Sequence, residues 1–162
     1  MRHRVGKGVV AGLVLAGAVL GLVASPASAS RTDGSHQIAF NIVRMVGANE
    51  VPPADPDGSG IFAYIAFKDH LCYVITARNI DPPIAAHIHT GAAGVNGPIV
   101  VALQVPDPIG ADCITAEQDE SLNSTMVLTQ GELDAIIANE AGYYANVHTA
   151  PFPAGAIRGQ LR

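Results

Sequence analysis

The stretch IFAYIAFKDHLCYVITAR, residues 61–78, decides the fold class. Two apolar runs rich in β-branched and aromatic residues, 61–67 and 71–78, flank the short polar segment Lys68-Asp69-His70. Runs of this kind separated by a few polar residues predict two antiparallel strands joined as a hairpin. The chain is therefore expected to contain an antiparallel β-sheet.

On both sides of this hairpin, further strand-like segments alternate with segments expected to be loops. A Pro- and Gly-rich loop is expected at 47–60, because proline cannot join a central ladder and glycine marks tight turns. Residues 106–122 are expected to be an irregular acidic segment. Together the runs predict an all-β, antiparallel sandwich or barrel. Six further segments have strand-like composition: 37–44, 85–90, 98–105, 124–129, 143–149 and 155–161.

One short helix is predicted at about 130–140. Thr129 is followed three residues later by Glu132, the capping-box pattern that satisfies free N–H groups at a helix start. Gly142 is the expected C-terminal stop. Three apolar residues are expected on one face of this helix: Leu133, Ile136 and Ile137.

Residues 1–29 have the organisation of a secretory signal peptide. A basic start precedes the apolar run 8–24, and Ala27-Ser28-Ala29 is a cleavage pattern that makes Ser30 the expected mature start. The alternative is a membrane anchor, although the run is short for a spanning helix. We therefore expect a secreted, extracellular protein with a single domain at 30–162 and no membrane span after cleavage.

Charge and cysteine content narrow the class of protein further. Beyond residue 29 the chain has six Lys and Arg against fourteen Asp and Glu, a formal net charge of −8. Nucleic acid is not an expected partner, since phosphate binding needs clustered basic residues. Cys72 and Cys113 are expected to form a disulfide in an oxidising compartment. Two free thiols, or a cysteine in a metal site, are the alternatives.

His87 and His89 are the strongest candidates for chemistry. Side chains alternate along a strand, so both point to one face, and His148 in the strand-like segment 143–149 is a third candidate. Asn146 and Tyr144 share the face of His148 by the same period. Three neutral imidazoles suit copper or zinc. The alternative is structural, with the histidines hydrogen-bonding loop carbonyls at a corner of the sheet.

Other motifs are weaker. Asp55 to Gly60 resembles the start of a calcium loop, but Ala66 stands where a glutamate is needed, so a turn explains it better. Gly91, Gly94 and Gly97 are read as a connection between strands, because no P-loop lysine follows. No complete catalytic set is present, and the sequence does not decide whether the protein is an enzyme.

Three motifs together resemble the CHRD domain, a family named after chordin that also occurs in secreted bacterial proteins. They are GANEVPP (47–53), AAHIHTGAAGVNGPIVVAL (85–103) and YYANVHTAPFPAGAIRGQL (143–161). The resemblance implies an immunoglobulin-like or superoxide dismutase-like Greek-key sandwich or barrel. The family usually has a glutamate before Ile-Arg-Gly-Gln, where this chain has Ala156.

Two functional hypotheses follow from the resemblance. The first is a non-catalytic binding or envelope-associated module for an extracellular protein or ligand that the sequence does not identify. The second is a copper or zinc domain that uses His87, His89 and His148 in a superoxide dismutase-like site. Strand alternation also places Arg158 and Gln160 together, and Arg158 is predicted to pair with Glu50 and join the first and last strands.

Overall fold

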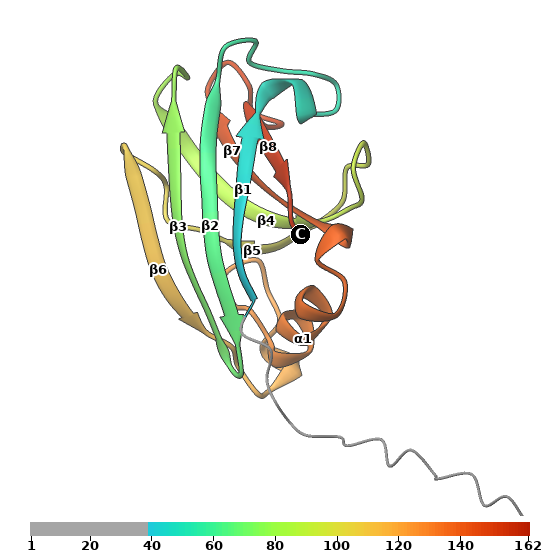
Figure 1. Cartoon of the computed structure of the whole chain (residues 1–162). Coiled ribbons are helices and arrows are strands. Elements are labelled where there is room, and N and C mark those ends of the chain that lie inside the picture. Colours follow the sequence, from blue (N-terminus) through green and yellow to red (C-terminus); the bar gives the residue numbers. More distant parts are fainter. Residues whose placement is uncertain (1–38) are drawn as a thin grey trace, which may run out of the picture. The chain divides into compact units, whose positions relative to one another are not determined.

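Eight strands form one continuous antiparallel sheet in the part of the chain that the computed structural model describes, residues 39–162. Their order across the sheet is β5-β4-β7-β8-β1-β2-β3-β6. The sheet curls, so that β4, β5, β7 and β8 cross behind β1, β2, β3 and β6 (Figure 1). The strands are β1 Ala39–Val46, β2 Ser59–Phe67, β3 His70–Arg78, β4 Pro83–Thr90, β5 Ile99–Ala102, β6 Ile109–Thr115, β7 Tyr143–Thr149 and β8 Ile157–Gln160.

The connections between strands make a Greek key. β1, β2 and β3 are joined as successive neighbours, but β7 returns to lie beside β4, so it is not next to β6. The ladder is open between β5 and β6, which end the sheet on either side. The predicted all-β, antiparallel, sandwich- or barrel-like fold is confirmed. Below, β1, β2, β3 and β6 are called the first layer, and β4, β5, β7 and β8 the second layer.

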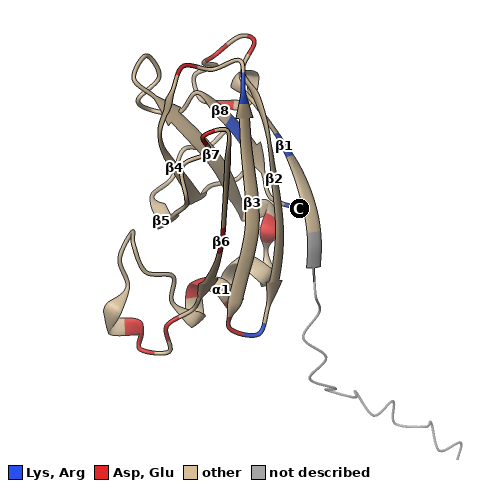
Figure 2. Ribbon diagram, turned by 90° about the vertical axis from the view of Figure 1, so that its left-hand side faces the viewer, with Lys and Arg blue, Asp and Glu red and all other residues tan. Residues whose placement is uncertain are grey.

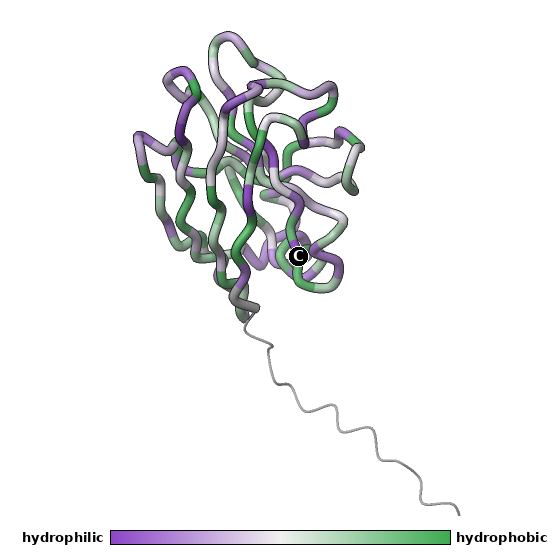
Figure 3. The backbone as a smooth tube through the Cα atoms, turned by 45° about the horizontal axis from the view of Figure 1, so that its top comes forward, coloured by the Kyte–Doolittle hydropathy of each residue, from purple (hydrophilic) through white to green (hydrophobic). Residues whose placement is uncertain are grey.

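The predicted hairpin 61–78 is formed by β2 and β3. The pairing runs from Ser59 opposite Arg78 to Phe67 opposite His70, and Lys68 adopts a positive φ of 50° in the tight turn. Along β2 the buried residues alternate with less buried ones, as a strand with one face on a core requires. The strands carry most of the hydrophobic residues (Figure 3).

The core lies between the two layers. Phe62 and Tyr64 stack with ring centroids 5.3 Å apart, and Ile88 and Val147 reach the same cluster from the second layer. Burial of each large side chain of this kind contributes about 1.5–3 kcal/mol. One face of β4 and of β7 is therefore buried in the core, and the opposite face of each strand points away from it.

The helix α1, Gln130–Ala138, lies at one end of the sheet (Figure 1). It buries Leu133 and Ile136, and the predicted capping box is present, with the Thr129 side chain and Glu132 each accepting from the other's backbone. The helix ends earlier than expected, at Ala138, and the N–H of the capping residue Asn139 donates to the carbonyls of Ala135 and Ile136. Three short 3-10 turns complete the structure at Gly47–Asn49, Glu120–Leu122 and Glu140–Gly142.

Two segment predictions were wrong. The segment 106–122 contains the strand β6, which pairs with β3 over seven residues, and so is not irregular throughout. The segment 124–129 is not a strand, since it forms only isolated bridges such as Ser124 to Val127. Its apolar residues pack individually: Leu128 is buried in the core, whereas Met126 is exposed.

The predicted signal peptide, residues 1–29, lies outside the described residues. Within 39–162, no helix is long and apolar enough to cross a membrane. Most of the acidic side chains lie in the loops and turns at the ends of the sheet (Figure 2).

Candidate metal centre

The face of β4 and β7 that points away from the core carries the histidines. In the antiparallel register His87 lies opposite Asn146, His89 opposite Tyr144 and Ala85 opposite His148. Residues opposite each other point to the same side of a sheet. Strand alternation therefore correctly predicted that these polar side chains share one face.

The structure brings the three predicted histidines together. His87 Nδ1 lies 3.0 Å from His148 Nε2. One nitrogen from each of His87, His89 and His148 can be chosen so that all lie within 4.8 Å of one another. Among residues 39–162 this is the only group of three or more His, Cys, Asp or Glu side chains close enough to share a metal ion.

Backbone carbonyls fix the orientation of two of these rings. His89 Nδ1 lies 3.0 Å from the Gly97 carbonyl oxygen, and His148 Nδ1 lies 3.1 Å from the Pro153 carbonyl oxygen. A carbonyl only accepts, so each Nδ1 carries the proton and each Nε2 presents a lone pair. This carbonyl–imidazole arrangement is how proteins orient histidine ligands of metals.

Burial keeps the three histidines neutral. His89 and His148 are each 8% exposed, and His87 is half-buried. Burial lowers the pKa of all three, and the neighbouring His148 and His89 contribute to a pKa of about 4 for His87. Metal binding requires the neutral imidazole, so the cluster is in a ligating state at neutral pH.

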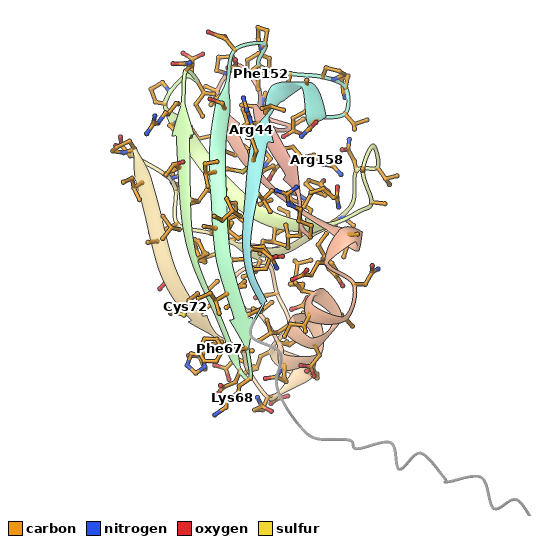
Figure 4. The ribbon with its side chains drawn as sticks, in the orientation of Figure 1. Arg44, Phe67, Lys68, Cys72, Phe152 and Arg158 are labelled. Carbon is orange, nitrogen blue, oxygen red and sulfur yellow. A yellow bond between two sulfur atoms is a disulfide. The ribbon has the colours of Figure 1, made fainter. Side chains whose placement is uncertain are left out.

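Arg158 holds the loop that covers this face. Arg158 is 1% exposed, and its guanidinium carbon lies 3.3 Å from the centre of the Tyr144 ring. Nη2 donates to the carbonyls of Ala92 and Val95, each at 2.9 Å, and Nη1 donates to Asn96 Oδ1 at 3.2 Å. Arg158 on β8 (Figure 4) thus anchors the β4–β5 loop, residues 91–98, over the second layer.

Glu50 does not form the predicted ion pair with Arg158. No contact within 4.0 Å joins the two charges, and in residues 39–162 the only basic side chain found that close to a carboxylate is His70, beside Asp69. Glu50 is 5% exposed, and burial raises its pKa to about 7 although the charge of Arg158 and the Asn146 amide lower it. The first and last strands are joined instead by backbone pairing of Val46 with Arg158.

Unsatisfied buried polar atoms gather at the cluster. Buried polar atoms normally have a hydrogen-bond partner, and those without one often mark an ion or water site. Three of the exceptions belong to the cluster and its neighbours, and they include the free Nε2 of His89. This donor set fits a bound cation. The four exceptions in the described residues are Glu50 Oε1, His89 Nε2, Asn146 Nδ2 and Thr149 Oγ1.

The remaining predicted residues lie elsewhere. Cys72 on β3 (Figure 4) faces Cys113 on β6, and their sulfur atoms are at disulfide-bonding distance. Asp55 Oδ1 accepts from the backbone N–H groups of Asp57 and Gly58, which makes it a turn-stabilising residue. The sequence reasoning missed the Gly97 and Pro153 carbonyls, because a backbone acceptor in a loop has no residue-type signal.

Fold and centre together define a class of protein: a Greek-key β-domain with a histidine cluster on the outer face of one layer, beneath ordered loops. The chain belongs to the CHRD family, because the model of the CHRD domain matches residues 43–161. No curated protein and no solved structure is detectably similar to the chain.

Proposed function

We propose that the protein is a secreted CHRD-domain binding module that holds one copper or zinc ion through His87, His89 and His148. One observation carries this proposal: a buried set of neutral imidazoles in which His89 Nε2 has no partner while His89 Nδ1 is bonded to Gly97. A buried acceptor without a protein partner marks a place for an ion or an ordered water, and the convergence of three imidazoles on that place favours an ion. An expected extracellular location and the disulfide-bonded cysteines support the secreted part of the proposal.

Copper is the ion that this donor set favours. Imidazole nitrogens bind both metals, but divalent copper binds a given nitrogen site more tightly than zinc. His87 contributes Nδ1, so its proton moves to Nε2 when the ion enters, and no net charge has to be created. The bound ion would supply a positive charge to the cluster, and the three histidines would hold it in place.

The test is the metal content of the untagged chain from Ser30 onward. We expect one copper ion per chain by elemental analysis and saturable Cu²⁺ binding in a competition titration. His87→Ala combined with His89→Ala removes two ligands and should abolish the stoichiometric binding. His70→Ala is the matched control, because His70 lies on β3 in a hydrogen bond with Asp69 and outside the cluster.

Two results would contradict the proposed metal binding. Wild-type protein that takes up neither copper nor zinc stoichiometrically would refute the proposal. So would a double variant that retains the metal with unchanged affinity.

A further inference from the structure

Asn146 is a polar residue that contacts the histidine cluster directly. It lies on β7 two residues before His148, on the same face, and is 1% exposed. Its Oδ1 is 3.0 Å from His148 Nε2. We infer that Asn146 Oδ1 is a fourth ligand of the ion held by the three histidines, and that Glu50 is the positioning residue that orients the Asn146 amide.

This inference rests on the proposed function, and its first support is a conflict between acceptors. His148 Nδ1–H donates to the Pro153 carbonyl, so Nε2 carries a lone pair. Asn146 Oδ1 is also an acceptor, and two acceptors 3.0 Å apart repel each other. The proton on His87 Nδ1 is directed at His148 Nε2. It gives that nitrogen a donor but leaves Asn146 Oδ1 without one. A cation between the three atoms removes the conflict.

The second support is the orientation of the amide. Rotated by 180°, Asn146 would donate Nδ2–H to His148 Nε2 in an ordinary hydrogen bond. Its oxygen would then turn toward Glu50, whose buried carboxylate lies against Gly155, in the loop that supplies the Pro153 carbonyl to His148 Nδ1. An ionised Glu50 carboxylate and the amide oxygen would repel each other, so ionised Glu50 favours Nδ2 on its own side and Oδ1 on the histidine side.

Glu50 packs against the loop that follows β7. It is buried beside Gly155, where a Cβ atom would collide with the Glu50 carboxylate. Glu50 Oε1 and Asn146 Nδ2 both lack a hydrogen-bond partner. A small movement of the amide on metal binding would pair these two atoms and would direct Oδ1 to the ion.

The fourth ligand changes what the centre can do. Three nitrogens and one oxygen complete a four-coordinate set, whereas catalytic centres keep a position open for water or substrate. His148 Nε2 lies 3.0 Å from both His87 Nδ1 and Asn146 Oδ1. Two ligand atoms that each lie about 2.1 Å from one ion and subtend an angle of about 90° at it have this spacing, and such an angle is typical of tetragonal Cu²⁺. The fourth ligand is therefore expected to hold Cu²⁺ more tightly than the three imidazoles would alone.

Asn146→Leu tests the ligand, because leucine has a similar shape and no donor atom. We expect Cu²⁺ affinity to fall about tenfold or more and the electron paramagnetic resonance spectrum of bound Cu²⁺ to change. Asn146→Asp keeps an oxygen donor and adds charge, so it should bind Cu²⁺ more tightly and shift the spectrum. Thr149→Val is the control, since Thr149 is also buried on β7 with an unpaired oxygen and is not in the proposed ligand set.

Glu50→Gln tests the positioning role. The glutamine amide can donate to Asn146 Oδ1 and draw it away from the ion, so Cu²⁺ affinity should fall. In an Asn146→Asp background the same change should have little effect, because a carboxylate presents an oxygen in either orientation. An equal loss in both backgrounds would overturn the role of Glu50.

The outcomes separate this inference from the proposed function. Wild-type protein that binds neither copper nor zinc refutes the metal centre itself. Wild-type protein with copper, combined with Asn146→Leu of unchanged affinity and spectrum, refutes only the fourth ligand. Should Asn146→Leu fail to fold, Asn146→Asp decides: affinity and spectrum identical to wild type would overturn the inference.

Discussion

At the scale of single residues, two buried groups at the centre respond to pH in opposite directions. The pKa of His87 falls to about 4, whereas that of Glu50 rises to about 7. Between pH 4.5 and 6.5 the unfolded chain protonates His87 and the folded chain does not, so His87 makes stability rise with pH. Over the same range the folded chain keeps the proton of Glu50 and the unfolded chain loses it, so Glu50 makes stability fall with pH.

Glu50→Gln should therefore reveal the histidine effect in the metal-free protein. With Glu50 ionisation removed, the free energy of unfolding is expected to fall more steeply as pH is lowered from 6.5 to 4.5. One proton corresponds to a slope of at most about 1.4 kcal/mol per pH unit. Urea unfolding at several pH values, with a chelator present, measures this slope.

The control for this pH dependence is Asp55→Asn, a change of another buried carboxylate, whose Oδ1 accepts from the backbone N–H groups of Asp57 and Gly58. It should lower stability without steepening the slope between pH 4.5 and 6.5. Equal slopes for wild type and Glu50→Gln would contradict the opposing roles of Glu50 and His87.

At the scale of elements, the β4–β5 loop depends on one side chain. Arg158 binds the carbonyls of Ala92 and Val95 with one guanidinium nitrogen and Asn96 with another. Arg158→Lys keeps the charge but cannot reproduce this fork or the stacking on Tyr144. We expect the free energy of unfolding to fall by about 2–3 kcal/mol, because buried acceptors lose their donors.

The same change should also weaken metal binding, because the loop carries the Gly97 carbonyl that orients His89. Arg44→Lys is the matched control, since Arg44 is exposed on β1. Denaturant unfolding and a Cu²⁺ competition titration measure the two effects. Arg158→Lys with wild-type stability would show that the loop is held by other contacts.

Sequence periodicity predicted which residues of the candidate metal centre share a face within each strand. Because strand side chains alternate, the spacing of His87 and His89, and of His148 and Asn146, already places each pair on one face. The register that joins β4 to β7 could not be predicted, since it depends on a Greek-key connection between distant segments. The partners of Arg158 lie in a loop whose conformation depends on tertiary contacts, so the prediction of Glu50 as its partner failed.

Two predictions of secondary structure failed because strand propensity is a property of the local sequence, whereas a strand also needs a neighbouring strand to pair with. Residues 109–115 contain Gly110, Asp112 and Cys113, which do not form an apolar run, yet β6 completes the first layer by pairing with β3. Residues 124–129 are apolar enough for a strand but find no long partner. Strand formation is decided by an available edge as much as by composition.

At the scale of the whole molecule, the disulfide-bonded cysteines and the histidine cluster lie in different layers of the fold. Cys72 and Cys113 lie in the first layer, opposite each other in the β3–β6 ladder, whereas the histidines lie on the second layer. β6 ends the sheet and pairs, within the described residues, only with β3. The disulfide is therefore placed to secure the open edge of the barrel.

Replacing both cysteines, by Cys72→Ser with Cys113→Ser, should lower the free energy of unfolding by about 2–4 kcal/mol, because the link closes a long loop. The cysteines are 41 residues apart. Cu²⁺ affinity of the folded variant should stay unchanged, since the centre belongs to the other layer. Urea unfolding and metal titration measure both, and a reductant should destabilise wild type but not the variant. A variant that folds normally but loses copper would show that the two layers are coupled and contradict this division.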